Sequence, residues 1–212
     1  MDEARLAAHR ATAARIIRKL ELRNMTGHYC ETSAEAVELA LSLVAPGQEV
    51  TWGGSASFVQ SGIKAALESH GARMLDRSDA ATEPEREEMW RRQVSADWFF
   101  MGANAVTLDG ELVNIDGNAN RLALLLHGPE HVFVIAGMNK VVADVESGIK
   151  RIRTSTCPIN AARLHAGTPC ELTGVCADCH SKGCMCCQEV VTRHSRHDGR
   201  IHVALVGEDL GF

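Results

Sequence analysis

Residues 49–75 read EVTWGGSASFVQSGIKAALESHGARML, and this stretch decides the fold. The apolar run at 49–52 predicts a short buried strand that ends in a glycine turn at 53–55. Apolar residues at helical spacing follow over 57–69, and Gly71 ends that helix. A second apolar run at 73–75 predicts another strand. A strand, a glycine turn, a helix and a strand in this order are typical of a parallel β-sheet.

The same alternation extends to both sides of this stretch. Helices are predicted over 2–23, 33–44, 57–69, 82–94, 119–127 and 142–155, the last broken by Pro158 and resumed over 159–164. Strands are predicted over 49–52, 73–75, 98–101, 131–136 and 200–206, with a hairpin over 107–113 whose Asp109-Gly110 suits a type I′ turn. The pattern predicts a single α/β domain over 1–212 with a mostly parallel central sheet, in which 1–45 forms N-terminal helices.

The bulk composition limits the possible partners. A chain of 212 residues with 45% hydrophobic residues is long and apolar enough for one full core. The net charge of −5 provides no electrostatic footprint for nucleic acid, so no nucleic-acid partner is expected. No apolar run approaches the roughly 18 residues that cross a bilayer, and the first residues lack the features of a signal peptide. We therefore expect no membrane partner and a cytoplasmic location.

Polar residues gather after three of the predicted strands. They are Gly53, Gly54, Ser55, Asn104, Asp109, Asn114, Asp116, Asn120, Arg121, Asn139 and Lys140. Ligands of open α/β sheets lie beyond the carboxyl ends of the strands, so these residues predict one polar pocket. Asp109 or Asp116 could move a proton, Arg121 could hold an anion, and Lys140 could do the same or act as a catalytic amine. Ordinary turns and a solvated surface lysine are the alternatives.

Six of the eight cysteines lie within 18 residues, in the run TPCELTGVCADCHSKGCMCCQ at 168–188. Thiols stay reduced in the cytoplasm, so clustered cysteines there more often bind metal than form disulfides. The spacing of Cys170, Cys176 and Cys179, followed by a crowded trio at 184–187, fits an iron–sulfur cluster at least as well as structural zinc. Cys30 and Cys157 stand alone in the sequence and are expected to be small buried hydrophobes.

Several of these motifs together resemble the LUD-domain family, which is associated with lactate utilisation. The matching pieces are 53–55, 104–110, 114–117, 120–121, 137–140, 169–179 and 207–212. The resemblance implies a Rossmann-like fold similar to that of glucosamine-6-phosphate isomerase, ribose-5-phosphate isomerase and the CoA-transferases. It also implies a cysteine-rich metal-binding insertion over 168–190 with the ligands Cys170, Cys176, Cys179 and Cys186. Cys184 and Cys187 replace an Arg and an Asn of the family pattern and add two thiols.

Two hypotheses of function follow. The first is an enzyme, or a subunit of one, that uses a [4Fe–4S] cluster on a small anionic carboxylate or phosphorylated substrate, with hydratase or isomerase chemistry. The second is an accessory protein of a lactate-oxidising complex, in which zinc or a cluster only stabilises the cysteine segment. Association with iron–sulfur oxidoreductase subunits is expected in the second case. A homodimer is also expected, because the apolar face of helix 2–23 needs a cover.

Overall fold

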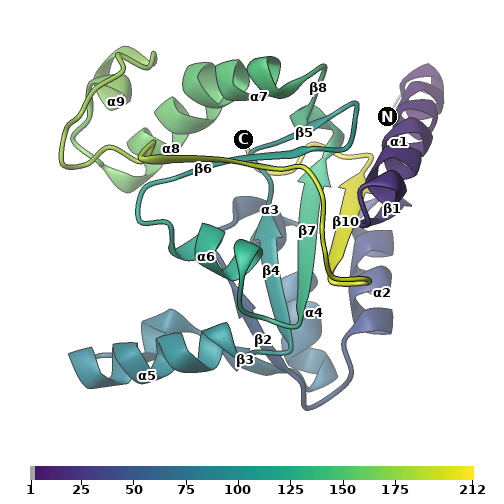
Figure 1. Ribbon diagram of the computed structural model, residues 1–212, viewed down its shortest axis with the longest axis horizontal. Helices are drawn as coiled ribbons and strands as arrows, with labels where there is room; N and C mark the ends of the chain where they lie inside the picture. The colour runs from purple at the N-terminus through teal and green to yellow at the C-terminus, as the bar shows by residue number, and fades with distance from the viewer. Residues whose placement is uncertain (1–2) are drawn as a thin grey trace.

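Six parallel strands form the central sheet, in the order β1-β10-β7-β4-β2-β3 (Figure 1). The structure is a computed structural model and describes residues 3–212. The strands are β1 (Thr26–Cys30), β2 (Glu49–Trp52), β3 (Arg73–Leu75), β4 (Trp98–Gly102), β7 (His131–Gly137) and β10 (Ile201–Val206). The middle strands β4, β7 and β10 are almost wholly buried, as in parallel sheets covered on both faces. The predicted α/β fold with a mostly parallel sheet is confirmed.

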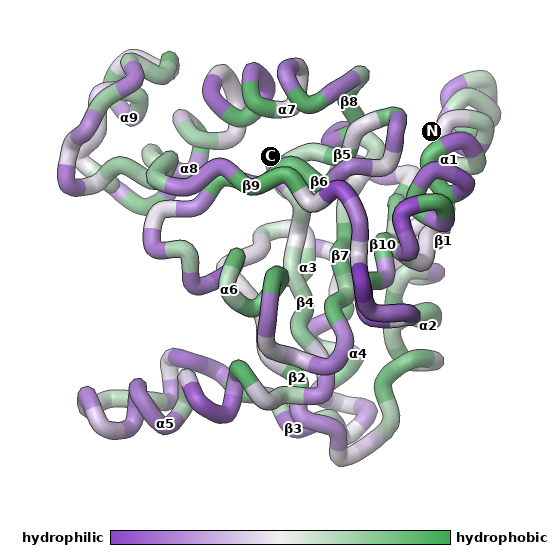
Figure 2. Tube along the Cα trace, viewed as in Figure 1, coloured by the Kyte–Doolittle hydropathy of each residue, from purple (hydrophilic) through white to green (hydrophobic). Residues whose placement is uncertain are grey.

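Helices pack on both faces of this sheet. One face carries α1 (Glu3–Leu22) and α6 (Asn120–Leu126), and the other carries α2 (Ser33–Leu43), α3 (Ala56–Gln60) and α4 (Ile63–His70). Neighbouring residues of a strand point to opposite sides, so one strand serves two cores. In β4, Phe99 packs into the core with α1 and α6, whereas Phe100 packs into the core with α2 to α4. The central strands are accordingly the apolar middle of the molecule (Figure 2).

Helix α5 (Glu83–Val94) extends along the outside of the domain with a largely hydrophilic surface (Figure 2). It begins with the capping box that the sequence predicts. The Glu85 carboxylate accepts a hydrogen bond of 2.8 Å from the backbone N–H of Thr82, which satisfies a donor that a helix start leaves unpaired. The predicted start of this helix is therefore confirmed.

A smaller sheet lies beyond the carboxyl ends of the central strands (Figure 1). Its order is β8-β5-β6-β9, with the bounds β5 (Ala105–Thr107), β6 (Leu112–Asp116), β8 (Val141–Val142) and β9 (Gln188–Thr192). Strand β8 follows β7 through a single 3₁₀ turn, η2 (Met138–Lys140). A helical segment of α7 (Val145–Arg151), the π-helical η3 (Ile152–Thr156) and α8 (Cys157–Leu164) packs against this sheet. The cysteine-rich segment, which includes α9 (Pro169–Thr173), connects α8 to β9.

Two elements of the N-terminal half differ from the prediction. Strand β1 pairs with β10 at the edge of the sheet, where the pattern predicts no strand. Its residues are mostly half-buried and include Thr26 and His28, so the alternation that marks strands is weak. The helix predicted over 57–69 is two helices, because Gly62 adopts left-handed backbone (φ 82°) between α3 and α4. Residues 1–2, where the first predicted helix begins, lie outside the described residues.

Two predicted details of the C-terminal half are also corrected. The β5–β6 hairpin has a three-residue loop, closed by Gly110 N–H donating to Thr107 O at 2.9 Å, with left-handed backbone at Gly110 alone. A type I′ turn would need Asp109 there as well. Pro158 does not break the helix around it. A π turn precedes it, in which Cys157 N–H donates to Ile152 O, and this wider turn accommodates a residue that has no N–H.

Helix α1 buries its apolar face within the same chain. Ala13, Ile16 and Leu20 have no exposed surface. Leu6 and Ile17 on the same helix are half-buried, and the homodimer expected from this face stays a prediction. Within residues 3–212, no helix combines the length and the apolar character that crossing a lipid bilayer requires.

Candidate functional site

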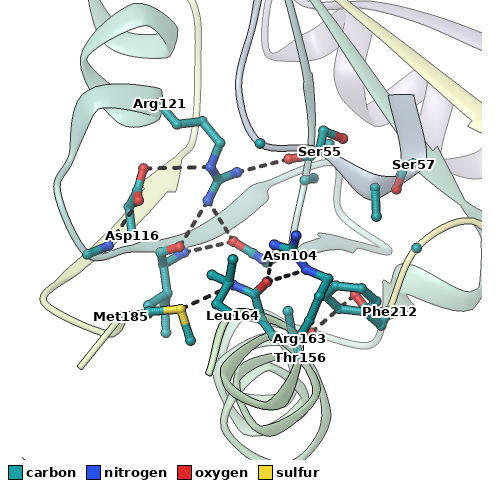
Figure 3. Close-up of a pocket in the computed structure, with 18 of the residues that line it drawn as sticks. Ser55, Ser57, Asn104, Asp116, Arg121, Thr156, Arg163, Leu164, Met185 and Phe212 are labelled. Carbon is teal, nitrogen blue, oxygen red and sulfur yellow. Dashed lines mark hydrogen bonds and ion pairs between the residues drawn. The ribbon is translucent and has the colours of Figure 1, made fainter. Parts of the chain in front are cut away.

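A polar cavity of about 410 Å³ opens at the carboxyl ends of β2 and β4, and we call it the polar pocket (Figure 3). From β2 the chain moves outward to β3, whereas from β4 it moves the other way to β7. Such a switch in strand order leaves a crevice between the two loops. The walls come from the turn after β2, the loop after β4, the end of β6 and the start of α6, with α8 and the last residues of the chain opposite.

The guanidinium of Arg121 ties these walls together (Figure 3). Its Nη1 and Nη2 donate four hydrogen bonds of 2.9–3.0 Å, to the backbone oxygens of Gly102 and Ile115 and the side-chain oxygens of Asn104 and Asn114. These two nitrogens carry four hydrogens, so all of them are engaged. Gly53 permits the approach, because a Cβ there would lie 2.9 Å from Arg121 Cγ. Arg121 is therefore a brace between β4 and β6, not the free anion-binding fork that the sequence predicts.

Asp116 supplies the carboxylate among the described residues that line the pocket. Its Oδ1 accepts a hydrogen bond of 2.9 Å from the backbone N–H of Gly117. Its Oδ2 is buried and lies 3.6 Å from Arg121 Nε, and it has no hydrogen-bond partner among residues 3–212. Buried oxygens are normally paired, so this one is a position that a ligand donor can complete. Asp116 can accept a hydrogen bond or a proton from a substrate.

Lys140 brings an amine to the inner wall of the pocket. The residue ends the turn after β7, and 5% of its surface is exposed. Its Nζ donates to Ser57 Oγ at 2.7 Å, and no carboxylate of the described chain pairs with it. Burial, followed by the positive charges of Arg151 and Arg121, lowers the pKa of Lys140 to about 7. The amine is therefore partly neutral near pH 7, and an anion beside it would restore its charge.

Two further arginines line the pocket without any motif that marks them in the sequence. Arg77 lies in a 3₁₀ turn after β3, η1 (Arg77–Asp79). Arg163 projects from α8, where it donates to Asn160 Oδ1 at 2.6 Å and lies over the ring of Phe212. In the part of the chain that the structure describes, neither guanidinium has a carboxylate partner. Only the fold brings these two helical residues to the strand ends, which is why the sequence pattern missed them.

Most of the predicted pocket residues line this cavity. They are Gly54, Ser55, Asn104, Asp116, Asn120, Arg121 and Lys140. Gly53 and Asn114 lie directly behind the wall, against Arg121. Asn139 does not line the pocket, since its Oδ1 accepts a hydrogen bond of 3.2 Å from the backbone N–H of Leu210. It fixes the C-terminal segment that covers the pocket.

Asp109 does not reach the polar pocket, which corrects the prediction. It lies at the tip of the β5–β6 hairpin, and its side chain is half exposed. Its Oδ1 pairs with Arg15 at 3.7 Å and with Lys19 at 3.4 Å, both on α1. The hairpin directs its tip toward α1, so a residue close to Asp116 in sequence lies at the far end of the strands.

Seven cysteines line a second cavity, of about 390 Å³, which we call the cysteine cavity. They are Cys157, Cys170, Cys176, Cys179, Cys184, Cys186 and Cys187. All four predicted metal ligands are therefore among them. Every cysteine of the chain is a free thiol. The cavity thus gathers reduced sulfur from α8, α9 and the irregular segment between α9 and β9.

Cys157 is buried in the core of the smaller sheet, as predicted, but it does not stand alone. It begins α8, and its Sγ lies 3.1 Å from Cys186 Sγ. The hydrogen bond within this pair lowers the pKa of Cys157 and raises the pKa of Cys186. A separation of 29 residues hides the pairing from any spacing rule.

The donor set of the cysteine cavity fits a thiolate-bound metal or iron–sulfur cluster. Soft thiolates in an enclosed site, with no disulfide among them, are the ligands that such centres use. The sulfurs do not converge on one point, however. Within residues 3–212, no three His, Cys, Asp or Glu side chains are grouped closely enough to hold one metal ion. The ligand set Cys170, Cys176, Cys179 and Cys186 stays a prediction.

The polar pocket and the cysteine cavity share a wall. Met185 lines both of them, and Asn160 Nδ2 contacts its Sδ at 3.3 Å. The backbone N–H of Cys187 also donates to Asp116 O at 3.0 Å. A group held by the cysteines would therefore lie next to the pocket.

The fold and these cavities define an α/β protein with a polar pocket at a switch in strand order and a thiol-lined cavity beside it. The family model of the LUD domain matches residues 13–206. The chain belongs to the LUD-domain family, and the resemblance of its motifs is confirmed. No curated protein is significantly similar to the chain in sequence.

Solved structures extend this comparison. A DUF162 family protein from Deinococcus radiodurans is similar with a TM-score of 0.54 and 14% identity, over 94% of this chain and 98% of that chain. This likeness shows a shared fold. eIF2B beta from Chaetomium thermophilum is more weakly similar, with a TM-score of 0.38 and 13% identity over 54% of this chain and 44% of that chain. Ribose 5-phosphate isomerase from Plasmodium falciparum has a TM-score of 0.31 and 14% identity over 53% of this chain and 54% of that chain.

Proposed function

We propose that the protein is an enzyme, or a subunit of one, that binds a small anionic carboxylate or phosphorylated substrate in the polar pocket. One observation carries the proposal. Among the described residues that line the pocket, four carry basic side chains, Arg77, Arg121, Lys140 and Arg163, and one, Asp116, carries an acidic side chain. Lys140 is buried without a counter-ion, which costs free energy that a ligand's negative charge would remove. Arg77 and Arg163 are exposed to solvent, so their donors are accessible to an anion in the pocket.

Each charged group has a distinct role in this proposal. Arg77 and Arg163 have donors to spare and hold the anionic end of the substrate. Lys140 acts at the reacting end, where its amine can take up or release a proton near pH 7. Asp116 accepts a substrate hydrogen bond or proton at its unpaired Oδ2. Arg121 keeps the walls in place.

Calorimetric titration tests the proposal. The probes are inorganic phosphate, lactate and pyruvate, the last two because the family is associated with lactate utilisation. Arg163→Gln should weaken the binding of the preferred probe at least about tenfold, or about 1.4 kcal/mol. The control Arg91→Gln removes an exposed arginine of α5 and should change nothing. Equal affinity of wild type and Arg163→Gln for all three anions would contradict the proposal.

A metal centre in the cysteine cavity is the second part of the proposal. Its support is the gathering of seven free thiols around one cavity that shares a wall with the polar pocket. Cys170, Cys176, Cys179 and Cys186 would hold the centre. A [4Fe–4S] cluster that only three of them hold firmly would supply Lewis acidity through its open iron, whereas zinc bound by all four would stabilise the segment. A cytoplasmic location, where thiols stay reduced, belongs to this proposal.

Anaerobic purification followed by iron, sulfide and zinc analysis tests this part. A cluster predicts a brown protein with equal iron and sulfide and a visible absorption that reductant bleaches. Zinc together with an absence of anion binding would favour the accessory role, in contact with iron–sulfur oxidoreductase subunits of a lactate-oxidising complex. Protein without any metal after such purification would contradict both versions.

A further inference from the structure

Ser57 and Lys140 form a hydrogen-bonded pair at the inner wall of the polar pocket. The distance from Lys140 Nζ to Ser57 Oγ is 2.7 Å. Both residues line the pocket, and both are nearly excluded from bulk water, with 1% of Ser57 and 5% of Lys140 exposed. Ser57 comes from the helix after β2, and Lys140 comes from the turn after β7. These two strands lie on opposite sides of β4 in the sheet, so the pair joins the segments that follow them.

The surroundings of the pair favour a neutral amine. The charged groups that act on Lys140 are Arg151 and Arg121, and both are positive. Burial and these charges together lower the pKa of Lys140 to about 7. A neutral amine has a lone pair that can take the proton of a hydroxyl at hydrogen-bond distance.

The C-terminal segment holds the serine hydroxyl against the lysine. Ser57 Oγ donates to Leu210 O at 3.2 Å. The backbone of Gly211 lies against both side chains, since a Cβ there would lie 2.7 Å from Ser57 Oγ and 3.0 Å from Lys140 Nζ. Ser57 Oγ therefore borders the cavity at hydrogen-bond distance from the amine. Rotation of the hydroxyl from Leu210 O toward Lys140 Nζ would direct its proton to the neutral amine for the attack.

We propose that Ser57 is a nucleophile activated by Lys140, and that the pocket cleaves small esters that carry an anionic group. This proposal rests on the proposed function, because Arg77 and Arg163 would bind the anionic group of the ester. The ester carbonyl is uncharged, so a substrate placed in this way leaves Lys140 neutral. An inorganic anion that fills the pocket would instead favour the charged lysine and block the reaction.

The steps balance without an added oxidant or reductant. Ser57 Oγ bonds to the carbonyl carbon while its proton passes to Lys140 Nζ. The carbon–oxygen bond of the ester breaks, and the leaving alcohol takes that proton from Lys140. Water then attacks the acyl-serine, with its proton accepted by Lys140 and returned to Ser57 Oγ. The products are the free acid and the alcohol.

A sulfonyl fluoride probe tests the pair on the full chain. Phenylmethylsulfonyl fluoride should bond to Ser57 Oγ with loss of fluoride, and mass spectrometry of the digested protein locates the adduct. Lys140→Met should slow this labelling at least tenfold, and Ser57→Ala should abolish it. In wild type the labelling rate should rise with pH around the pKa of about 7, and sulfate should inhibit it.

Matched controls separate the pair from its neighbours. Ser61→Ala removes another buried serine hydroxyl just beyond α3, and Lys64→Met removes a half-buried amine of α4 that pairs with Glu68 and Asp76. Both variants should label at the wild-type rate. Wild-type protein that forms no Ser57 adduct, or a Lys140→Met variant that labels as fast as wild type, would overturn the proposal. If phosphate still binds in that case, the nucleophile proposal for Ser57 and Lys140 is wrong, whereas the proposed anion binding in the polar pocket is retained.

Discussion

The polar pocket and the cysteine cavity are neighbours that the chain builds in opposite ways. The pocket is made at the ends of buried strands, and Arg121 alone ties four wall atoms together. The cysteine cavity is made mostly by residues 174–187, which contain no helix or strand, and by the short α9, in which Leu172 is exposed, with Cys157 of α8 on one side. The fold therefore preforms the pocket, whereas the proposed metal centre would have to draw the sulfurs together.

The largest expected effect separates the two regions directly. Cys176→Ser should abolish metal binding and make residues 168–187 susceptible to proteolysis, because the centre is what orders that segment. Phosphate affinity should stay unchanged. Cys30→Ala is the matched control, since Cys30 is buried in the main core away from the cysteine cavity. Metal analysis and limited proteolysis measure the outcome, and full metal content in Cys176→Ser would remove Cys176 from the ligand set.

The next effect tests whether the pocket is preformed by its brace. Arg121→Met should lower the free energy of unfolding by about 3–5 kcal/mol, because it leaves buried oxygens without donors. Arg91→Met, at an exposed site on α5, should change it by less than about 0.5 kcal/mol. Urea denaturation measures both. A loss below about 1 kcal/mol for Arg121→Met would mean that other contacts hold the walls.

The smallest effect is expected at Asp109, which the sequence places in the pocket and the structure does not. Its pairs with Arg15 and Lys19 are exposed, so Asp109→Asn should cost less than about 1 kcal/mol in urea denaturation. The Asp109→Asn variant should bind phosphate with the same affinity as the wild-type protein. A clear loss of phosphate binding would show that the hairpin tip reaches the pocket in solution.

Strong local signals made most of the fold predictable. The apolar runs of β4, β7 and β10 and the glycine turn after β2 are each visible within a few residues, and they place the polar pocket at the strand ends. Two features with weak or distant sequence signals were not predicted. Strand β1 is a partly polar edge strand, and the wide turn before Pro158 depends on packing against the smaller sheet.

The site was predictable only in part, for the same reason. Motifs identify Asp116 and Lys140 because Asp116 ends strand β6 and Lys140 ends the short turn after the buried strand β7. Arg163 and Cys157 lie on a helix that the fold brings over the strand ends, and no spacing rule links them to their partners. The bracing role of Arg121 is hidden in the sequence, because two of its four acceptors, on Asn114 and Ile115, belong to a second sheet that the sequence reveals only as a hairpin.

The central claim is that the polar pocket binds anions, and that an inorganic anion filling it restores the charge of the buried Lys140 amine. Titration calorimetry with sulfate, in buffers of different ionisation enthalpy, tests it most directly, since sulfate does not itself titrate near neutral pH. The pKa of about 7 leaves the free amine mostly neutral at pH 8, and a bound anion raises that pKa, so binding should take up a proton. The uptake should vanish at pH values well below 7, where the amine is already charged, and in Lys140→Met. Sulfate binding with no proton uptake at pH 8, or the same uptake in Lys140→Met, would contradict the account.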